Sequence, residues 1–132
     1  MRIARIDRAQ ARPPAHPEWF PGTVLHQLLN DPADAGGVEA IAVWFEPGSR
    51  TRPHVHELDQ ILQVIKGEGV VATEAEKRLI RAGDWVVVPG GIWHRHGATP
   101  ESALCHVSIK QPGETDWSSP WGDWDEYMEG AV

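Results

Sequence analysis

Hydrophobic residues recur along this chain in short runs that are bounded by turn-forming residues. Between residues 22 and 110 each run has the length of an ordinary strand, roughly 3–10 residues, and is rich in Val, Ile, Leu and Trp. The candidate strands span residues 22–28, 38–46, 51–56, 59–66, 69–74, 77–81, 85–89, 92–97 and 102–110. Glycine and proline separate them. Many short strands without a helical period predict an all-β sandwich or barrel, and a helix is expected only near residues 116–129.

Two segments of opposite charge flank this strand-rich part. Residues 1–21 carry several arginines and the Pro13-Pro14 break, and we expect an arm that contributes one edge strand. Residues 22–110 form the β domain itself. Residues 111–132 form a tail that is acidic, rich in Trp and free of Lys and Arg. Because exposed ion pairs contribute only ~0–1 kcal/mol, we expect both flanking segments to be solvated. The alternatives are that they lie against one another or against a neighbouring subunit.

Composition narrows the class of protein. The chain has 132 residues, of which 41% are hydrophobic and 23% charged, as in one globular domain. Its net charge of -7 argues against nucleic-acid binding, which needs a cationic surface. No apolar stretch approaches the ~18 residues of a transmembrane helix, and the opening residues do not resemble a secretory signal. The single cysteine, Cys105, suits a reducing compartment, so we expect a cytoplasmic protein with no membrane partner.

Histidine placement gives the sharpest chemical signal. His54 and His56 are two positions apart, so on a strand they point to the same face and can bind one metal ion. Gln60 follows closely and offers an amide oxygen. His94 and His96 form a second pair with the same spacing. A single histidine is more often a core or surface residue than a ligand, but two such pairs in one small β domain favour a metal site.

The residues around these histidines resemble the two motifs of the cupin family. The first runs Gly48-x5-His54-x-His56-x3-Gln60-x6-Gly67, and the second runs Gly83-x5-Pro89-x-Gly91-x2-His94-x3-Ala98. The resemblance implies a single cupin jelly-roll β-barrel over residues 22–110. It also implies one divalent metal ion, Mn, Zn or Fe, or Ni acquired during purification. The implied ligands are His54, His56, Gln60 and His94. Cupins of this size usually pair through sheet edges, which implies a homodimer.

Gln60 departs from the family motif, which usually has Glu at this position. A carboxylate would cancel one unit of the metal's charge, whereas an amide oxygen leaves a divalent site at its full charge. Such a centre favours Lewis-acid chemistry over cycling between oxidation states. The opposite interpretation, a metal site that has decayed, stays open.

Local phrases resemble most closely the bacterial cupins with a three-His, one-Gln site that act as hydroxynitrile lyases. These phrases are Trp19-Phe20-x-Gly22-Thr23-Val24, Phe45-Glu46-Pro47-Gly48-x-Arg50-Thr51, His94-x-His96-Gly97-Ala98 and His106-x-x-Ile109. The resemblance implies a carbon–carbon lyase acting on a small organic substrate, with Thr51, His106 and Lys110 beside the metal. Polyketide cyclases and decarboxylase-like cupins share the ligand set. An iron-dependent dioxygenase and a non-catalytic metal- or ligand-binding module are the alternatives.

The last candidate strand carries the implied catalytic groups. A period of two makes His106, Ser108 and Lys110 face inward together. Lys110 stands where the lyase-like cupins tend to have Gln, and it could hold an anion such as cyanide, act as a base, or extend to water. Cys105 lies on the opposite face of this strand and is not expected to be a nucleophile.

The other candidate residues have simpler interpretations. We expect Ile41, Val43 and Phe45 to line the barrel interior. His96 either orients a ligand or is a residue of the barrel wall. His16 and His26 are expected at the surface or at an edge, and Asp59 and Asp84 in turns.

Overall fold

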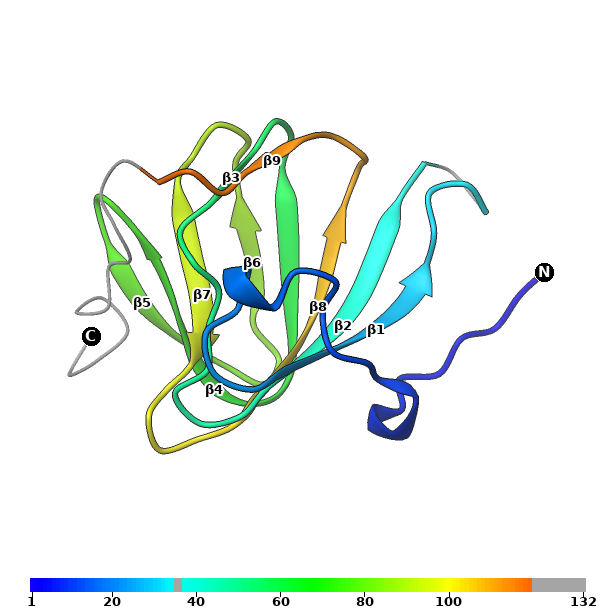
Figure 1. The fold of residues 1–132 in the computed structure, drawn as a ribbon, viewed down its shortest axis with the longest axis horizontal. Coiled ribbons are helices and arrows are strands. Elements are labelled where there is room, and N and C mark those ends of the chain that lie inside the picture. Colours follow the sequence, from blue (N-terminus) through cyan, green and yellow to red (C-terminus); the bar gives the residue numbers. More distant parts are fainter. Residues whose placement is uncertain (35–36, 120–132) are drawn as a thin grey trace.

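The computed structural model describes residues 1–34 and 37–119, and within them the fold is all-β (Figure 1). The strands are β1 (Val24–Asn30), β2 (Glu39–Phe45), β3 (Val55–His56), β4 (Gln60–Thr73), β5 (Lys77–Arg81), β6 (Trp85–Val88), β7 (His94–Ala98), β8 (Leu104–Lys110) and β9 (Thr115–Asp116). Two short 3-10 helices, η1 (Arg8–Gln10) and η2 (Pro17–Trp19), precede them. The predicted all-β class is confirmed, and none of the described helices could cross a membrane.

The long strand β4 joins the two layers of the fold. Its first half pairs with β8 and β6, and its second half pairs with β5 and β7, all antiparallel. Strands β1 and β2 extend the first layer beyond β8, in the order β1-β2-β8-β4. In Figure 1 β4 and β8 lie between β1 and β2 on one side and β5 and β7 on the other. Because β4 belongs to both layers, it holds the two layers against each other, so that their inner faces meet.

Gly67 allows β4 to pass from one layer to the other. The pairing with β8 shifts register between Val64 and Lys66, which marks a bulge. Gly67 follows with φ +84°, and a Cβ there would lie 1.9 Å from the carbonyl oxygen of Ala103. Two separate strands, 59–66 and 69–74, were expected here, and that prediction is wrong. Glycine bends the strand at this point because only its backbone fits against Ala103; it does not end the strand.

The ends of the predicted pattern also differ from the structure. Of the expected strand 51–56 only Val55–His56 is a strand, preceded by isolated bridges at Arg50 and His54. Strand β9 pairs with β3 where the helix over 116–129 was expected to begin, so that expectation is wrong for the described part. The remaining residues of that segment, 120–132, lie outside the described residues.

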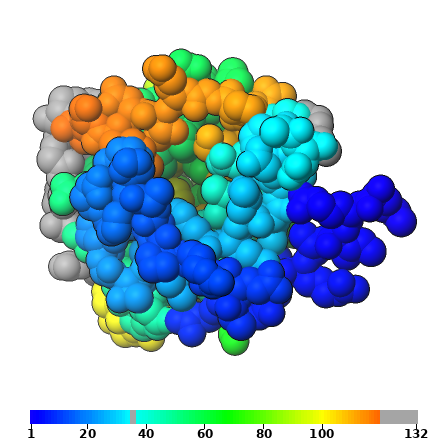
Figure 2. Space-filling model, turned by 45° about the vertical axis from the view of Figure 1, so that its right-hand side comes forward, coloured from blue at the N-terminus to red at the C-terminus, as the bar shows by residue number. Residues whose placement is uncertain are grey.

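The N-terminal arm is attached to the barrel at several points, although most of its residues remain exposed to solvent as expected. Its expected edge strand is reduced to one bridge between Arg12 and His26. Arg8 lies 2.6 Å from Glu46 and Arg2 lies 3.7 Å from Asp34, so arginines of the arm pair with acidic residues of the β domain. Figure 2 shows the arm along one rim of a hollow, with the β1–β2 region and the segment after β8 on the other rims.

The apolar core fills one end of the barrel. Its buried members are Val24, Val43, Phe45, Val64, Val71, Ile80, Val88, Ala98 and Leu104. Phe45 and Leu104 face one another where β2 ends and β8 begins. Toward the other end of β8 the inward positions become polar, from His106 through Ser108 to Lys110, and Gln60 opposes Lys110 there. Strand β8 therefore runs from an apolar end to a polar end, where it meets Gln60 of β4.

Candidate metal centre

Three histidines converge at the polar end of the barrel. The ligand atoms of His54, His56 and His94 all lie within 4.8 Å of one another, and the three residues are buried. His54 precedes β3, His56 lies on β3 and His94 begins β7. Paired backbone hydrogen bonds of 2.9 Å between His54 and His94 fix the two chain segments side by side. The arrangement brings together three of the four residues expected as metal ligands.

Hydrogen bonds orient these imidazole rings. Nδ1 of His54 lies 2.8 Å from the carbonyl oxygen of Arg52, and Nδ1 of His94 lies 2.9 Å from that of Ile92. A carbonyl only accepts, so Nδ1–H donates in both rings and the Nε2 lone pair is left for the centre. Burial lowers the pKa of His94 to about 4 and that of His54 well below its usual value, which keeps both rings neutral.

His56 is held by a residue that the sequence analysis did not identify. Its Nδ1 lies 2.9 Å from the hydroxyl oxygen of Thr115 on β9. Burial lowers the pKa of His56 to about 4. Its Nε2 is buried and has no hydrogen-bond partner among residues 1–34 and 37–119. A buried imidazole nitrogen with a free lone pair is what a metal ligand needs.

Gln60 adds a fourth uncharged side chain that can ligate a metal ion, beside the three histidines. Its amide nitrogen donates to the hydroxyl of Ser108 at 2.7 Å, which turns its oxygen toward the histidines. That oxygen lies 3.0 Å from Nε2 of His94. Since His94 already donates from Nδ1, two lone pairs face each other across this distance, an arrangement that a cation would stabilise. The residues therefore fit the divalent metal that the family motifs imply.

A cavity of about 140 Å³ is lined by His54, His56 and Gln60. Its polar wall includes the expected catalytic residues Thr51, His106 and Lys110 together with Ser108 and His96. Its apolar wall is formed by Phe20, Ile41, Val43, Phe45 and Trp117. The inward positions of β2 and β8 thus line the cavity as their period of two predicts.

His96 and His106 form a second pair beside the first. Nε2 of His106 lies 3.0 Å from Nδ1 of His96, and the backbone N–H of His96 donates to the hydroxyl of Thr51 at 3.3 Å. Burial lowers the pKa of His106 to about 3 and the pKa of His96 well below its usual value. Nε2 of His96 and Nδ1 of His106 have no hydrogen-bond partner within the described chain. These atoms remain available to a bound molecule.

Lys110 meets an acidic partner that the sequence analysis missed. Its Nζ lies 3.5 Å from a carboxylate oxygen of Glu39, and both side chains are mostly buried. Glu39 opposes Lys110 in the register of β2 and β8 and also lines the cavity. Residues of opposite charge often face one another across paired strands, as Glu39 and Lys110 do here. The sequence contains both residues, but it does not show that β2 and β8 pair.

Trp117 and His26 are two further residues whose place the sequence did not reveal. Trp117 stacks on His54, with ring centroids 4.3 Å apart, and on Trp19 at 4.8 Å. It therefore covers His54 from the side of the arm. The expectation for His26 is half right: β1 is an edge strand, but the ring lines the cavity and burial lowers its pKa to about 4.

The remaining candidates lie outside the cavity. Cys105 is buried on the other face of β8, and burial raises the pKa of its thiol to about 11. The side chains of Asp59 and Asp84 accept hydrogen bonds from the backbone of Gly90 and Arg81, as turn residues do. His16 is exposed beside Glu18, at 3.3 Å. None of these side chains lines the cavity.

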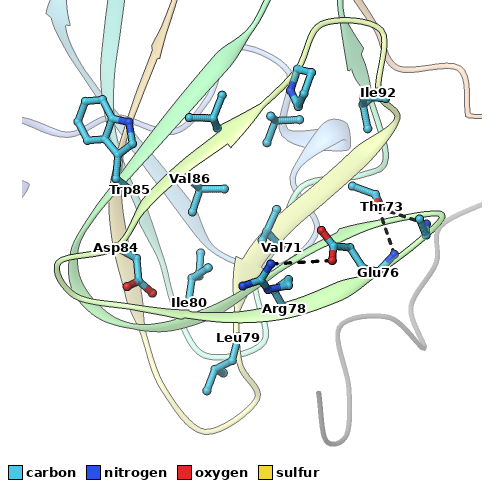
Figure 3. A pocket seen from close by; sticks show the side chains of 14 residues that line it. Val71, Thr73, Glu76, Arg78, Leu79, Ile80, Asp84, Trp85, Val86 and Ile92 are labelled. Carbon is cyan, nitrogen blue, oxygen red and sulfur yellow. Dashed lines mark hydrogen bonds and ion pairs between the residues drawn. The ribbon is translucent and has the colours of Figure 1, made fainter.

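A second and larger hollow lies elsewhere. A groove of about 600 Å³ runs between β5 and β6, the strands whose outer edges are unpaired in the described fold (Figure 3). Val71, Ile80 and Trp85 are among its lining residues, with Glu76 and Arg78 at its rim. No histidine lines it.

Comparisons with known proteins agree with this geometry. A protein of Granulicella tundricola named (R)-mandelonitrile lyase is 38% identical over 113 residues, covering 84% of this chain and 85% of that protein. A gentisate 1,2-dioxygenase of a Ralstonia species is 35% identical over 52 residues, covering 39% of this chain and 15% of that protein. The crystal structure of a cupin-like protein from Thermotoga maritima is 32% identical, with TM-score 0.76, and the match covers 83% of this chain and 86% of that chain. The family model described as "Cupin domain" matches residues 42–109, and the chain belongs to this family.

Proposed function

We propose that this protein is a metal-dependent carbon–carbon lyase that cleaves and forms cyanohydrins of small aldehydes. The observation that carries the proposal is the set of four neutral donors, with the Gln60 oxygen 3.0 Å from Nε2 of His94, next to a cavity large enough for one small organic molecule. The similarity over most of the chain to a protein named (R)-mandelonitrile lyase supports the same reaction class.

His54, His56, Gln60 and His94 are the residues that would hold the metal. When bound there, a divalent cation supplies Lewis-acid polarisation of a substrate oxygen. Because none of these four side chains carries a negative charge, they leave the charge of a divalent ion undiminished. The chain itself keeps the rings neutral by burial and aims them through Arg52, Ile92 and Thr115.

In this proposal His106 moves the proton. In cleavage, the hydroxyl proton of the cyanohydrin passes to an imidazole nitrogen, the carbonyl forms, and the bond to the nitrile carbon breaks with its electron pair on cyanide. Burial, which lowers the pKa of His106 to about 3, makes the imidazolium short-lived. Its proton then passes to cyanide, and hydrogen cyanide and aldehyde leave with the imidazole restored.

In this proposal Lys110 holds the leaving anion. Its ammonium group lines the same cavity and is steadied by Glu39 at 3.5 Å. An ammonium in a mostly buried position stabilises a developing anion more than one in water does. Thr51, whose hydroxyl accepts from the backbone of His96, contributes a further polar group beside the reacting oxygen.

The test combines metal analysis with turnover. Purified protein, loaded in turn with Mn, Zn and Fe, is assayed for release of benzaldehyde from racemic mandelonitrile. We expect about one ion per chain and cleavage with Mn or Zn, and loss of cleavage in His106→Phe with metal content unchanged. Stoichiometric metal with no cleavage of mandelonitrile or smaller cyanohydrins would refute the lyase.

The second candidate is an iron-dependent dioxygenase. It is favoured by the local match to a gentisate 1,2-dioxygenase, whose range covers 39% of this chain. Oxygen uptake with gentisate in the iron-loaded protein, together with inactivity toward cyanohydrins, would establish this candidate in place of the lyase. Inactivity in both assays would leave a metal- or ligand-binding module.

A further inference from the structure

His26 is a cavity histidine that neither the metal centre nor the proposed proton transfer uses. On β1 it opposes Val43, and Val43 in turn opposes His106 on β8. Residues that oppose one another across strands share a face of the sheet. His26 and His106 therefore stand on the same inner face with one valine between them, and two strand spacings separate their backbones by about 10 Å.

The ring of His26 has a free polar atom. Its Nε2 is buried and has no hydrogen-bond partner among the residues described here. The ring of Phe20 makes an edge-on contact with centroids 4.8 Å apart, which supplies at most a weak N–H···π interaction and no oxygen or nitrogen partner. The backbone of His26 bonds to Arg12, which explains the position of the arm but not the side chain. Buried polar groups are nearly always paired, so an unpaired nitrogen on a cavity wall points to a ligand.

The cavity between His26 and the metal-ligating residues suits an aromatic ring. Its volume of about 140 Å³ is close to the ~150 Å³ of an apolar protein cavity that holds benzene. Phe20 and Trp117, whose centroids are 5.4 Å apart, lie along it, and Trp117 stacks on His54 at 4.3 Å. The lining of the cavity thus combines the proposed metal ligands His54, His56 and Gln60 with aromatic rings and with His26, whose Nε2 is buried and unpaired among the described residues.

We propose that His26 forms a subsite for a hydroxyl substituent on the ring of an aromatic aldehyde or its cyanohydrin. The inference rests on the proposed function for the identity of the reacting group. A hydroxyl is the substituent that fits, because it can donate to or accept from a neutral imidazole. His26 is a specificity residue in this view, and it takes no part in bond breaking.

Binding of paired aldehydes tests the subsite without turnover. The probes are 3- and 4-hydroxybenzaldehyde, each compared with the methylbenzaldehyde of the same substitution, which has similar shape and no hydroxyl. Dissociation constants are measured on the metal-loaded protein in the absence of cyanide, by calorimetry. We expect at least one hydroxy isomer to bind about 3- to 10-fold more tightly than its methyl counterpart, the worth of one neutral hydrogen bond.

Variants of His26 then assign this preference. His26→Phe keeps a ring and removes both nitrogens, so it should bring the ratio to about one while the methyl compounds bind as before. His26→Gln, which restores a polar group, should recover part of the preference. The matched control is His16→Phe, at an exposed histidine, which should leave the ratio unchanged. Thermal unfolding of each variant verifies that the fold is intact.

The outcomes separate this inference from the proposed reaction. Equal binding of both isomer pairs by the unaltered protein, or a preference that persists in His26→Phe, would overturn the subsite even if cyanohydrin cleavage is observed. A preference that disappears in His26→Phe, in a protein that cleaves no cyanohydrin, would uphold the subsite and overturn the lyase.

Discussion

Two hollows in this barrel differ in a way that size does not reveal. The groove between β5 and β6 has about four times the volume of the inner cavity, roughly 600 Å³ against 140 Å³. Its charged groups are solvated: Arg78 and Glu76 lie 3.9 Å apart with most of their side chains exposed. The inner cavity instead contains buried imidazoles with free nitrogens.

The two hollows differ in what their polar groups cost the stability of the fold. An exposed ion pair contributes ~0–1 kcal/mol and can be lost at little cost. Burying a polar atom without a partner costs on the order of 1–3 kcal/mol. Such atoms occur in His56, His96 and His106, which line the inner cavity. A bound ligand that pairs with them would offset this cost. Unsatisfied burial, rather than volume, therefore locates the chemistry of this chain.

The largest effect is expected on metal content, when one of the proposed metal ligands is removed. His54→Ala takes away one of the four donors and should reduce the bound metal from about one ion per chain to almost none, as measured by mass spectrometry of the purified protein. The loss should exceed the roughly 10–100-fold that removal of a supporting residue costs. Arg78→Ala, in the groove, is the control and should keep full metal content; full occupancy in His54→Ala would contradict the site.

Acid should destabilise the metal-free protein because the buried histidines of the site resist protonation in the folded state. Burial lowers the pKa values of His26, His56 and His94 to about 4 in the folded protein, from the usual histidine value of 6.5 that the unfolded chain retains. Below pH 6.5 the unfolded chain binds protons that the folded chain does not, so the free energy of unfolding falls between pH 6.5 and about 4. Each ring contributes up to about 3 kcal/mol. Urea unfolding at pH 7.5, 6.0 and 5.0 measures this.

Variants at either hollow sharpen the pH test. His26→Phe should weaken the pH dependence between pH 7.5 and 5.0, since one buried ring no longer takes up a proton on unfolding. Trp85→Ala, at the groove, should leave the dependence as it is. Stability that is constant across this range would show that the cavity histidines are not buried in solution.

A smaller effect is expected from the residue that supports His56. Thr115→Val removes the hydroxyl at 2.9 Å from Nδ1 while keeping the shape of the side chain. Metal affinity should fall about 10–100-fold, because the ring loses the contact that orients it. The matched control is Thr73→Val, whose hydroxyl accepts from backbone N–H groups beside the groove. A competition titration with a chelating dye would show no change in that control.

The smallest effect is expected at the exposed apolar wall of the groove. Trp85 is 57% exposed, so Trp85→Ala removes few buried contacts. The free energy of unfolding should change by about 0.5 kcal/mol or less, with metal content and kcat/KM for mandelonitrile unchanged. A loss of cleavage in this variant would mean that the two hollows communicate.

Most strand positions and the inward face of β8 followed from the sequence. Alternation along β8 places His106 and Lys110 on one face, whichever strands β8 pairs with. That Val43 of β2 shares this face follows from the pairing register. The continuity of β4 past Gly67 did not follow, because glycine can either end a strand or bend it. The carbonyl of Ala103, on the segment before β8, decides between these outcomes.

The partners of the site residues were equally beyond the sequence. Thr115 lies 59 positions from His56 along the chain, yet it orients the ring of His56. Glu39 meets Lys110 only because β2 and β8 pair in this register. Trp117 reaches His54 from a tail that the sequence analysis treated as a surface segment. Local patterns specify which way a side chain points, but not what stands opposite it.

The sequence by itself determined the all-β class, the family and the spacing of His54 and His56, because strand periodicity and turn residues act over a few positions. The tertiary structure alone decided that His26 faces the cavity and that Gln60 turns its oxygen toward His94. The physical reason is that burial and hydrogen-bond pairing depend on segments that are far apart in the chain and are brought together only by strand register.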